Sequence, residues 1–347
     1  MELHTVWFGL IAVLFIGYFV LEGFDFGVGM LVGTLSDDDT DRRVVINTIG
    51  PVWDGNEVWV ITAGGATFAA FPEWYATLFS GFYLPLLAIL VALIVRGVAF
   101  EYRGKIDTHE WRHRWDLAIF WSSAVPALLW GVAFANIVRG VPLDADHEYA
   151  GSLLDLLSPY ALLGGLVTLT LFLLHGAVFV SLKTDGRVRH ASRALAARLA
   201  PVTVVLAAVF LLWTHGLTGN PASAVASVVA ALSLVAATLL TRTPREGWAF
   251  TATACTIGFA VLALFLALFP DVLPSTVPGN SLTVDNASST PYTLKVMTWV
   301  AAFGTPIVLV YEAWSYWVFR KRISRVHIGP GVEATTQEAI NEPSGVQ

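Results

Sequence analysis

Long apolar stretches constrain this chain more than any other feature. Segments of about 20 or more residues, each poor in charge, alternate with short polar connections. Such a segment crosses the roughly 30 Å hydrocarbon core of a bilayer as a helix, because a helix satisfies its own backbone hydrogen bonds. The sequence therefore predicts an all-α polytopic membrane protein with nine transmembrane helices, at residues 5–33, 52–71, 76–101, 116–138, 158–182, 199–218, 222–241, 248–269 and 294–319.

Composition supports this class and excludes several kinds of site. Charged residues make up only 13% of the chain, whereas soluble domains carry about a quarter. Cys255 is the single cysteine, which excludes disulfides within the chain, cysteine-rich metal sites and iron–sulfur ligation. The first residues, MELHTVWFGL, lack a basic region and a cleavage site. We therefore expect the first apolar segment to be a retained helix and not a signal peptide.

The distribution of lysine and arginine predicts the orientation. The connections after spans one, three, five and seven, together with the C-terminal flank, hold 17 of the 20 basic residues. Only Arg139 and Lys295 lie on the other side, and Arg96 lies within span three. Basic residues gather on the cytoplasmic side of membrane proteins. We therefore expect the N-terminus outside and the C-terminus inside.

No soluble domain interrupts the spans. We expect a single transmembrane domain over residues 1–328 and a polar cytoplasmic tail over 329–347. Eight of the helices can be divided into two four-helix units, 5–138 and 158–269, with 294–319 as an extra ninth helix. Because four is an even number, the two units would have the same orientation, unlike the inverted repeats of many secondary transporters.

Two carboxylates lie inside the first apolar segment. Glu22 and Asp25 fall on one helical face, and Gly23 and Gly27 form a neighbouring ridge that permits close helix contact. An ionised acid at the centre of a bilayer costs about 2.5–3.5 kcal/mol, so such residues face protein or water. A structural hydrogen bond to a neighbouring helix would explain them, but a role in proton or ion handling is favoured.

A second acid pair follows in the segment PVWDGNEVWVITAGGA. Asp54 lies within a turn of the boundary, where it could simply face the positive end of the helix dipole; Glu57 lies one turn deeper. Arg96 has a similar depth and is the candidate counter-ion. Together with Asp25 and Glu22, this pair predicts a ladder of titratable groups from the cytoplasm toward the bilayer centre.

The histidines argue against haem ligation by this chain. His175 is the only one well inside a span, and His215 lies near the outer end of another. Ligation by two histidines needs a pair at matching depth, and no cysteine or methionine pattern offers an alternative. We expect His175 to be a hydrogen-bonded packing residue, no metal site, and no haem bound by the chain alone. Trp59 is expected to point away from Asp54.

Several motifs resemble one family. The segments EGFDFGVGML, NTIGPVWDGNEVWVITAGGATFAAFP, FSGFYLPL, EYRGK and LKVMTWVAAFGTPIVLVYEAWSYW are similar to subunit II of cytochrome bd quinol oxidases. The resemblance extends in order from the first span to the ninth. It implies that the chain forms a heterodimer with a haem-bearing subunit I in the bacterial plasma membrane. This complex would oxidise quinol and reduce oxygen to water with protons from the cytoplasm. It would thereby generate a proton gradient.

The resemblance also implies roles for particular residues. Asp25 and Asp54 match acids of a proton route, and Trp59 matches a residue lining an oxygen route. Haems b and d would belong to the partner, and this chain would have no catalytic residue of its own. A structural quinone and a small accessory subunit are further expectations, as are bound lipids, and no nucleic acid is implied.

Two alternatives remain from the residues alone. A proton-coupled secondary transporter would explain the buried acids equally well. A purely structural scaffold would need no conduction role at all. Co-purification with a haem-bearing membrane protein would distinguish an oxidase subunit from a transporter. Mutation of the acids would distinguish a proton-conducting subunit from a structural scaffold.

Overall fold

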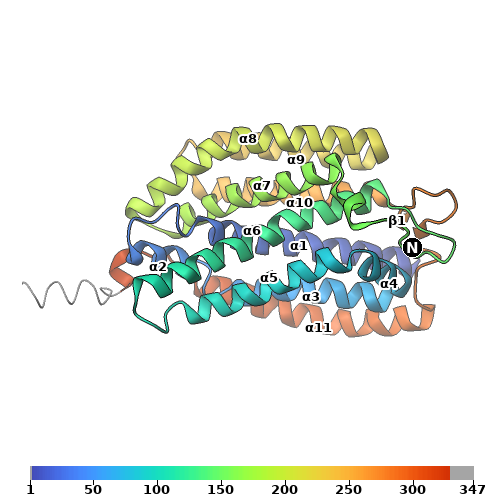
Figure 1. Cartoon of the computed structure of the whole chain (residues 1–347), viewed down its shortest axis with the longest axis horizontal. Helices are drawn as coiled ribbons and strands as arrows, with labels where there is room; N and C mark the ends of the chain where they lie inside the picture. Colours follow the sequence, from blue (N-terminus) through green and yellow to red (C-terminus); the bar gives the residue numbers. More distant parts are fainter. Residues whose placement is uncertain (1, 329–347) are drawn as a thin grey trace, which may run out of the picture.

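The computed structural model describes residues 2–328, and the predicted tail at 329–347 lies outside them. This part of the chain folds into helices that run along one common axis (Figure 1). The α-helices are α1 (Leu3–Leu31), α2 (Asp39–Asn47), α3 (Trp53–Ala70), α4 (Pro72–Gly81), α5 (Tyr83–Tyr102), α6 (His109–Arg139), α7 (Pro159–Lys183), α8 (Gly186–Thr218), α9 (Pro221–Leu240), α10 (Glu246–Leu268) and α11 (Pro291–Val318). Two 3₁₀ turns, η1 (Leu153–Leu157) and η2 (Arg325–His327), and an antiparallel pair of strands, β1 (Asp271–Leu273) and β2 (Leu282–Thr283), complete it.

Eight of the described helices are long and apolar enough to cross a membrane: α1, α5, α6, α7, α8, α9, α10 and α11. This confirms a polytopic helical membrane protein. The predicted second span, 52–71, forms α3 with 18 residues, but α3 is not among the eight. Its first turns carry Asp54, Asn56 and Glu57, which lower its mean hydropathy.

The structure corrects several predicted boundaries. The predicted span 76–101 begins too early, because residues 72–81 form the separate helix α4 and the helix is interrupted at Phe82. Pro85 explains the interruption. In a continuous helix its ring would clash with the preceding turn, and because it has no N–H one backbone hydrogen bond would be missing. With the break, Pro85 lies in the first turn of α5, where no such bond is needed.

Two predicted connections are also helical. The basic segment 183–198 was expected to be a connection, but α8 begins at Gly186 and includes most of it. The first connection contains α2, whose N-terminus is capped by the Asp38 side chain, which accepts a hydrogen bond from the Asp41 N–H at 2.9 Å. Hydropathy alone missed both segments because amphipathic or charged helices at a membrane surface are not apolar throughout.

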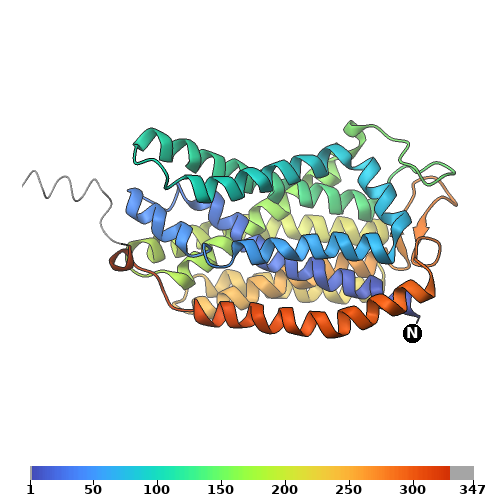
Figure 2. The ribbon, with the colours of Figure 1, turned by 90° about the horizontal axis from the view of Figure 1, so that it is seen from below.

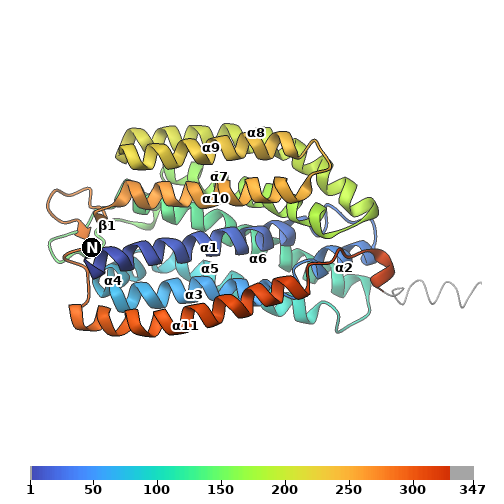
Figure 3. The same ribbon diagram turned by 180° about the vertical axis from the view of Figure 1, so that it is seen from behind.

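Helix α1 is central in the bundle. It contacts α3, α6, α7 and α10, and α7 to α10 pack together on one side of it. Seen from behind, α1 is visible between α10 and α11 (Figure 3). Helix α11 runs the length of the bundle along one edge (Figure 2) and has a single buried residue, Leu294.

Small residues bring α1 and α7 into backbone contact, as the glycine ridge predicts. A Cβ added to Gly27 would lie 2.0 Å from the carbonyl oxygen of Phe172, and one added to Gly176 would lie 2.5 Å from the backbone of Gly27. A Cβ on Gly23 would meet the Phe172 ring at 2.8 Å. The predicted close contact is therefore confirmed, with α7 as the partner helix.

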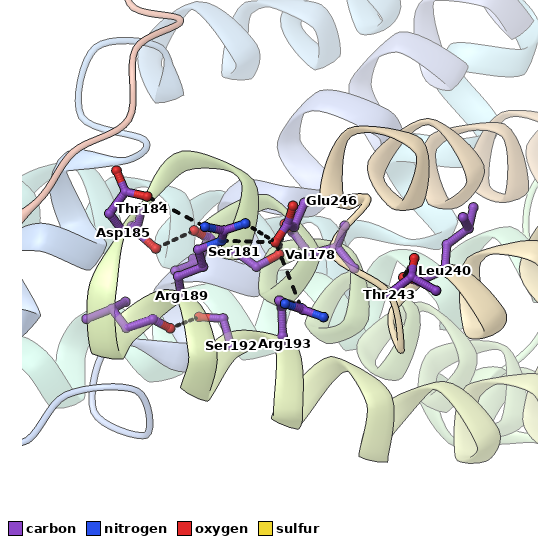
Figure 4. A network of polar contacts seen from close by, with 12 residues as sticks. Val178, Ser181, Thr184, Asp185, Arg189, Ser192, Arg193, Leu240, Thr243 and Glu246 are labelled. Atoms are coloured by element: carbon purple, nitrogen blue, oxygen red, sulfur yellow. Dashed lines mark hydrogen bonds and ion pairs between the residues drawn. The ribbon is translucent and has the colours of Figure 1, made fainter.

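The end of the bundle that carries α2 and η2 is held by ion pairs; we call it the basic end. Glu246 at the start of α10 accepts from Arg189 of α8 at 2.8 Å, with Arg193 at 3.9 Å (Figure 4). Asp41 of α2 is fully buried and accepts from both Arg187 and Arg325 at 2.9 Å. The segment after α11 is thereby tied to the α1–α2 and α7–α8 connections.

Candidate functional site

Arg96 joins the two predicted acid pairs. Its guanidinium, fully buried on α5, forms an ion pair with the equally buried Glu22 of α1 and lies 3.3 Å from Glu57 Oε1 of α3. The rings of Phe26 and Phe100 flank its charged carbon at 4.9 and 5.5 Å. Arg96 therefore contacts one acid of each pair, whereas the sequence suggested it as counter-ion to the second pair alone.

Asp25 interacts with Glu22 and Arg96 and connects this buried group to a hydrogen-bond chain. Its Oδ2 accepts from Asn56 Nδ2 at 2.6 Å, and the Oδ1 of Asn56 accepts from the Tyr316 hydroxyl, also at 2.6 Å. The chain thus connects α1, α3 and α11. Sequence reasoning missed Asn56 and Tyr316. The signal available for Asn56 was its place inside the quoted DGNE motif, between two acids.

Several atoms of this buried group have no hydrogen-bond partner within residues 2–328. They are Glu22 Oε2, Asp25 Oδ1, and Nε and Nη2 of Arg96. Buried polar atoms of this kind are usually satisfied, often by ordered water. The group therefore has the donors and acceptors needed to hold water between its side chains.

Asp54 lies apart from the buried group. It is exposed in the first turn of α3, and its Oδ1 accepts from the Gly55 N–H at 2.9 Å. The carboxylate of Glu312 on α11 lies close by, since a Cβ added to Gly55 would be 3.0 Å from it. This position also fits a charge at a helix N-terminus, the alternative interpretation of Asp54.

Trp59 faces α1, while Asp54 is exposed. A Cβ added to Gly17 of α1 would lie 2.2 Å from the Trp59 ring, so the missing side chain at Gly17 makes room for the indole. The residue is half-buried. Its contact with α1 is packing within the chain, and a role in an oxygen route stays a prediction.

His175 does not fit an axial haem ligand. Its Nδ1 lies 2.7 Å from Thr253 Oγ1 and its Nε2 lies 3.1 Å from the carbonyl oxygen of Val20. The imidazole also stacks on Phe250, with ring centres 4.7 Å apart. Because both ring nitrogens already have partners, the residue acts as a buried packing histidine. His215 is exposed.

One group at the opposite end has ligand atoms close enough for a metal ion. His4 Nε2 lies 3.1 Å from Glu2 and 3.2 Å from Asp285. Both carboxylates are largely exposed, and the three residues form an ordinary surface ion-pair cluster. They are far from the Arg96 group in the fold, so they add nothing to its chemistry.

An open groove of about 690 Å³ lies beside the buried group, between α3 and α5. Glu57 lines it, together with apolar side chains such as Ile61 and Tyr83, which are 70% and 61% exposed. A contiguous apolar surface of this kind marks an interaction with protein or lipid. Glu57 is thus accessible from this face, while Glu22 and Asp25 are not.

Comparison with known proteins identifies close sequence relatives along nearly the whole chain. The family model for cytochrome bd terminal oxidase subunit II matches residues 3–319. "Cytochrome bd ubiquinol oxidase subunit 2" of Bacillus subtilis (strain 168) is 42% identical over 330 residues, which cover 93% of this chain and 97% of that protein. "Cytochrome bd-I ubiquinol oxidase subunit 2" of Escherichia coli (strain K12) is 40% identical over 367 residues, covering 94% and 96%.

A solved structure has the same fold. A chain of the bd oxidase from Geobacillus thermodenitrificans superposes with a TM-score of 0.75 at 21% identity, covering 92% of this chain and 100% of that one. At this level of identity the likeness concerns the fold alone.

Proposed function

Because the chain belongs to the cytochrome bd terminal oxidase subunit II family, we propose that it conducts protons from the cytoplasm toward a haem-bearing subunit I. The chain is the second subunit of a terminal quinol oxidase, which is an oxidoreductase. It is itself a multi-pass protein of the bacterial plasma membrane. Family membership removes the secondary-transporter alternative. The scaffold alternative is tested below.

The observation that carries the proposal is the buried group of ionisable residues around Arg96. Reducing oxygen to water consumes protons, and these must reach the reaction site through side chains and water. Glu57, accessible from the groove, and the fully buried Glu22 lie on either side of one guanidinium. The unpartnered oxygens of Glu22 and Asp25 can each accept a hydrogen bond from water.

The proposed order of transfer begins at the exposed carboxylates. Asp54 would collect protons at the cytoplasmic end of α3, Glu57 would receive them, and Glu22 and Asp25 would hold them deeper. The positive charge of Arg96 offsets the repulsion between the negative charges of Glu57 and Glu22 within one low-dielectric region. Asn56 holds one oxygen of the Asp25 carboxylate and leaves the other without a partner.

The partner would supply the redox chemistry. Subunit I would bind haems b and d, oxidise quinol and reduce oxygen, while this chain binds and stabilises it through the α3–α5 face. A structural quinone, lipids and a small accessory subunit belong to the same proposal.

We retain Trp59 in an oxygen route as a further prediction. Its replacement by leucine would change the apparent oxygen affinity of the complex more than the quinol affinity. An unchanged dependence of the rate on oxygen would mean that Trp59 serves packing alone.

The topology is proposed from charge and position. We propose that α3 is a ninth span although it carries acids, because it lies between α1 and α11 in the bundle. The N-terminus would then be outside and the C-terminus inside. The helices before residue 138 and those between 158 and 269 would be two units of equal orientation, within one transmembrane domain over residues 1–328.

The test uses Asp25→Asn in the purified two-subunit complex. Proton conduction through Asp25 predicts quinol oxidation slowed at least several-fold, with an unchanged haem spectrum and normal assembly. The matched control is Asp116→Asn, a carboxylate that pairs with Arg103 outside the group at 2.6 Å.

Each other outcome has a definite meaning. Failure of the Asp25→Asn complex to assemble would make the acids structural, as the scaffold alternative holds. Assembly with normal rates and normal proton uptake would place the dominant proton route in subunit I and refute the proposal.

A further inference from the structure

A second large cavity lies at the basic end. Its volume is about 920 Å³, and it is lined by α1, α2, the α2–α3 connection, α7, α10, α11 and the segment that follows α11. Tyr316, whose hydroxyl donates to Asn56, also lines it, whereas Arg96 and its acids do not. The cavity lies among the ends of α1, α10 and α11, and Figure 3 shows the ribbon of α1 between those of α10 and α11.

The walls of the cavity are apolar and aromatic. Leu21 and Phe24 come from α1, Phe179 from α7, Phe250 from α10, and Val318 from α11. Phe24 and Phe179 stack with ring centres 4.0 Å apart, which gives the wall a rigid aromatic surface. Such walls suit an acyl chain, because each methylene group removed from water contributes favourably to binding.

The rim of the cavity is basic. Arg43, Lys183, Arg320, Lys321 and Arg322 line it, and no carboxylate does so within the described part of the chain. Apolar walls under a basic rim are the two features that a phospholipid with an anionic headgroup needs, and basic pockets between helices on the cytoplasmic side bind such headgroups.

Three of these cations have no acidic partner. Lys183 Nζ donates to the carbonyl oxygens of Phe319 and Lys321, the latter at 3.3 Å. The Arg320 guanidinium donates to the carbonyl of Trp317 at 2.5 Å and lies 4.2 Å from the centre of its ring. Within residues 2–328, the ion pairs of this end involve other arginines, and none includes Lys183, Arg320 or Lys321. Their charge is therefore left for an external anion.

The rim is held in place by the fold. The Ile323 N–H donates to the Lys183 carbonyl at 2.8 Å, and Arg322 pairs with Asp185 at 3.0 Å. The segment after α11 is thus tied across the end of α7, which fixes the position of the basic residues above the apolar walls. A preformed site of this kind loses little freedom when a ligand binds.

We propose that this cavity binds one anionic phospholipid from the adjacent leaflet, with its phosphate on Lys183, Arg320 and Lys321. Its acyl chain would lie between α10 and α11 along Leu21, Phe250 and Val318. This inference is independent of the proton route, and only the identity of the leaflet as the inner one depends on the proposed orientation.

The experiment is native mass spectrometry of the purified complex after delipidation in detergent. Phosphatidylglycerol and phosphatidylcholine with identical acyl chains are added in parallel, with inorganic phosphate as a third probe. We expect one tight phosphatidylglycerol, weaker phosphatidylcholine and no competition from phosphate. Lys321→Gln should weaken phosphatidylglycerol binding about fivefold, the effect of about 1 kcal/mol per basic residue. Arg242→Gln removes the same charge at an exposed residue that does not line the cavity, so it should leave phosphatidylglycerol binding unchanged.

A second variant tests the walls without altering charge. Val318→Trp, at a position that is 40% exposed, should fill the cavity and lower occupancy by both lipids. Equal binding of the two lipids with no effect of Lys321→Gln would overturn the proposal. So would competition by phosphate alone, a quinone found in the cavity of the native complex, or a site that opens only when residues 329–347 are removed.

Discussion

At the scale of single residues, the charge of Arg96 stabilises the neighbouring acids. Two carboxylates lie against one guanidinium: Arg96 and Glu22 are fully buried, and Glu57 is only partly exposed. Removing one member of a buried ion pair leaves an uncompensated charge, which typically costs about 3–5 kcal/mol. The site is therefore stable only as a set, and the effects of its substitutions should not add.

Arg96→Gln should lower the stability of the complex by about 3–5 kcal/mol, measured from thermal loss of the assembled two-subunit form. The double variant Arg96→Gln with Glu22→Gln should recover part of this loss, because the unpaired charge is gone. Arg114→Gln is the control: its i,i+4 pair with Glu110 is 74% and 76% exposed, so its contribution should be below about 1 kcal/mol. Equal losses for both arginines would contradict the role of Arg96.

The Tyr316 hydroxyl is the end of the chain that holds Asp25. Tyr316→Phe removes this donor and leaves Asn56 free to turn, so the Asp25 carboxylate loses its fixed orientation. We expect a several-fold slower quinol oxidation with an unchanged haem spectrum. Tyr311→Phe, an exposed tyrosine on the same helix, should have no effect. A full rate in Tyr316→Phe would show that the orientation of Asp25 is not needed.

The sequence identified the charged members of this group but not the neutral ones. Glu22 and Asp25 are conspicuous because acids are rare in apolar segments. Asn56 and Tyr316 are not, since amides and tyrosines are ordinary at helix contacts, and these two are 260 positions apart. Only the packing of α11 against α3 brings them together. No pattern along the chain contains that information.

At the scale of helices, hydropathy predicted where most spans lie but not where they begin. The predicted span 222–241, built from small apolar residues, is a helix, α9. The errors fall where a local rule competes with hydropathy: at Pro85, which ends one helix and starts another, and in the charged first turns of α6 and α8, which begin at His109 and Gly186 and not at 116 and 199. Which helices touch was predictable only where glycines permit backbone contact.

Gly27→Ala tests that contact. The added methyl group would overlap the carbonyl of Phe172, so α1 and α7 must move apart. We expect a destabilisation of about 1–3 kcal/mol, as for overpacked cores. Gly9→Ala on the same helix has nothing within 4 Å of the new Cβ and should be neutral or slightly stabilising. Thermal unfolding of both complexes makes the comparison, and equal stabilities would refute close packing.

At the scale of the whole molecule, α11 is joined to the bundle by polar contacts at both of its ends. Trp7 donates to Thr298 at 3.1 Å near one end, Tyr316 binds Asn56, and the segment after α11 is held at the basic end. Between these points its side chains are largely exposed, with Ile307 at 72%. Lipid or the partner subunit must cover this surface, so α11 should be the helix most dependent on assembly.

The placement of the two ends decides the number of crossings. Nine spans place the N-terminal and C-terminal ends on opposite sides of the membrane, whereas eight would place them together. The N-terminus and the basic end lie at opposite ends of the bundle (Figure 1). The chain is suited to cysteine labelling because Cys255 is its single cysteine and can be replaced by serine.

In the Cys255→Ser background, Glu2→Cys and Val326→Cys report the two sides. Both positions are exposed, Val326 at 91%, so each thiol should react freely. A maleimide that cannot cross the membrane, added to intact spheroplasts, should label position 2 and not 326, because the basic residues around 326 favour the cytoplasmic side. Opening the membrane should then label both. Labelling of position 326 from outside would reverse the orientation. Labelling of both positions in intact spheroplasts would remove α3 from the spans, and with it the depth order assigned to Asp54 and Glu57.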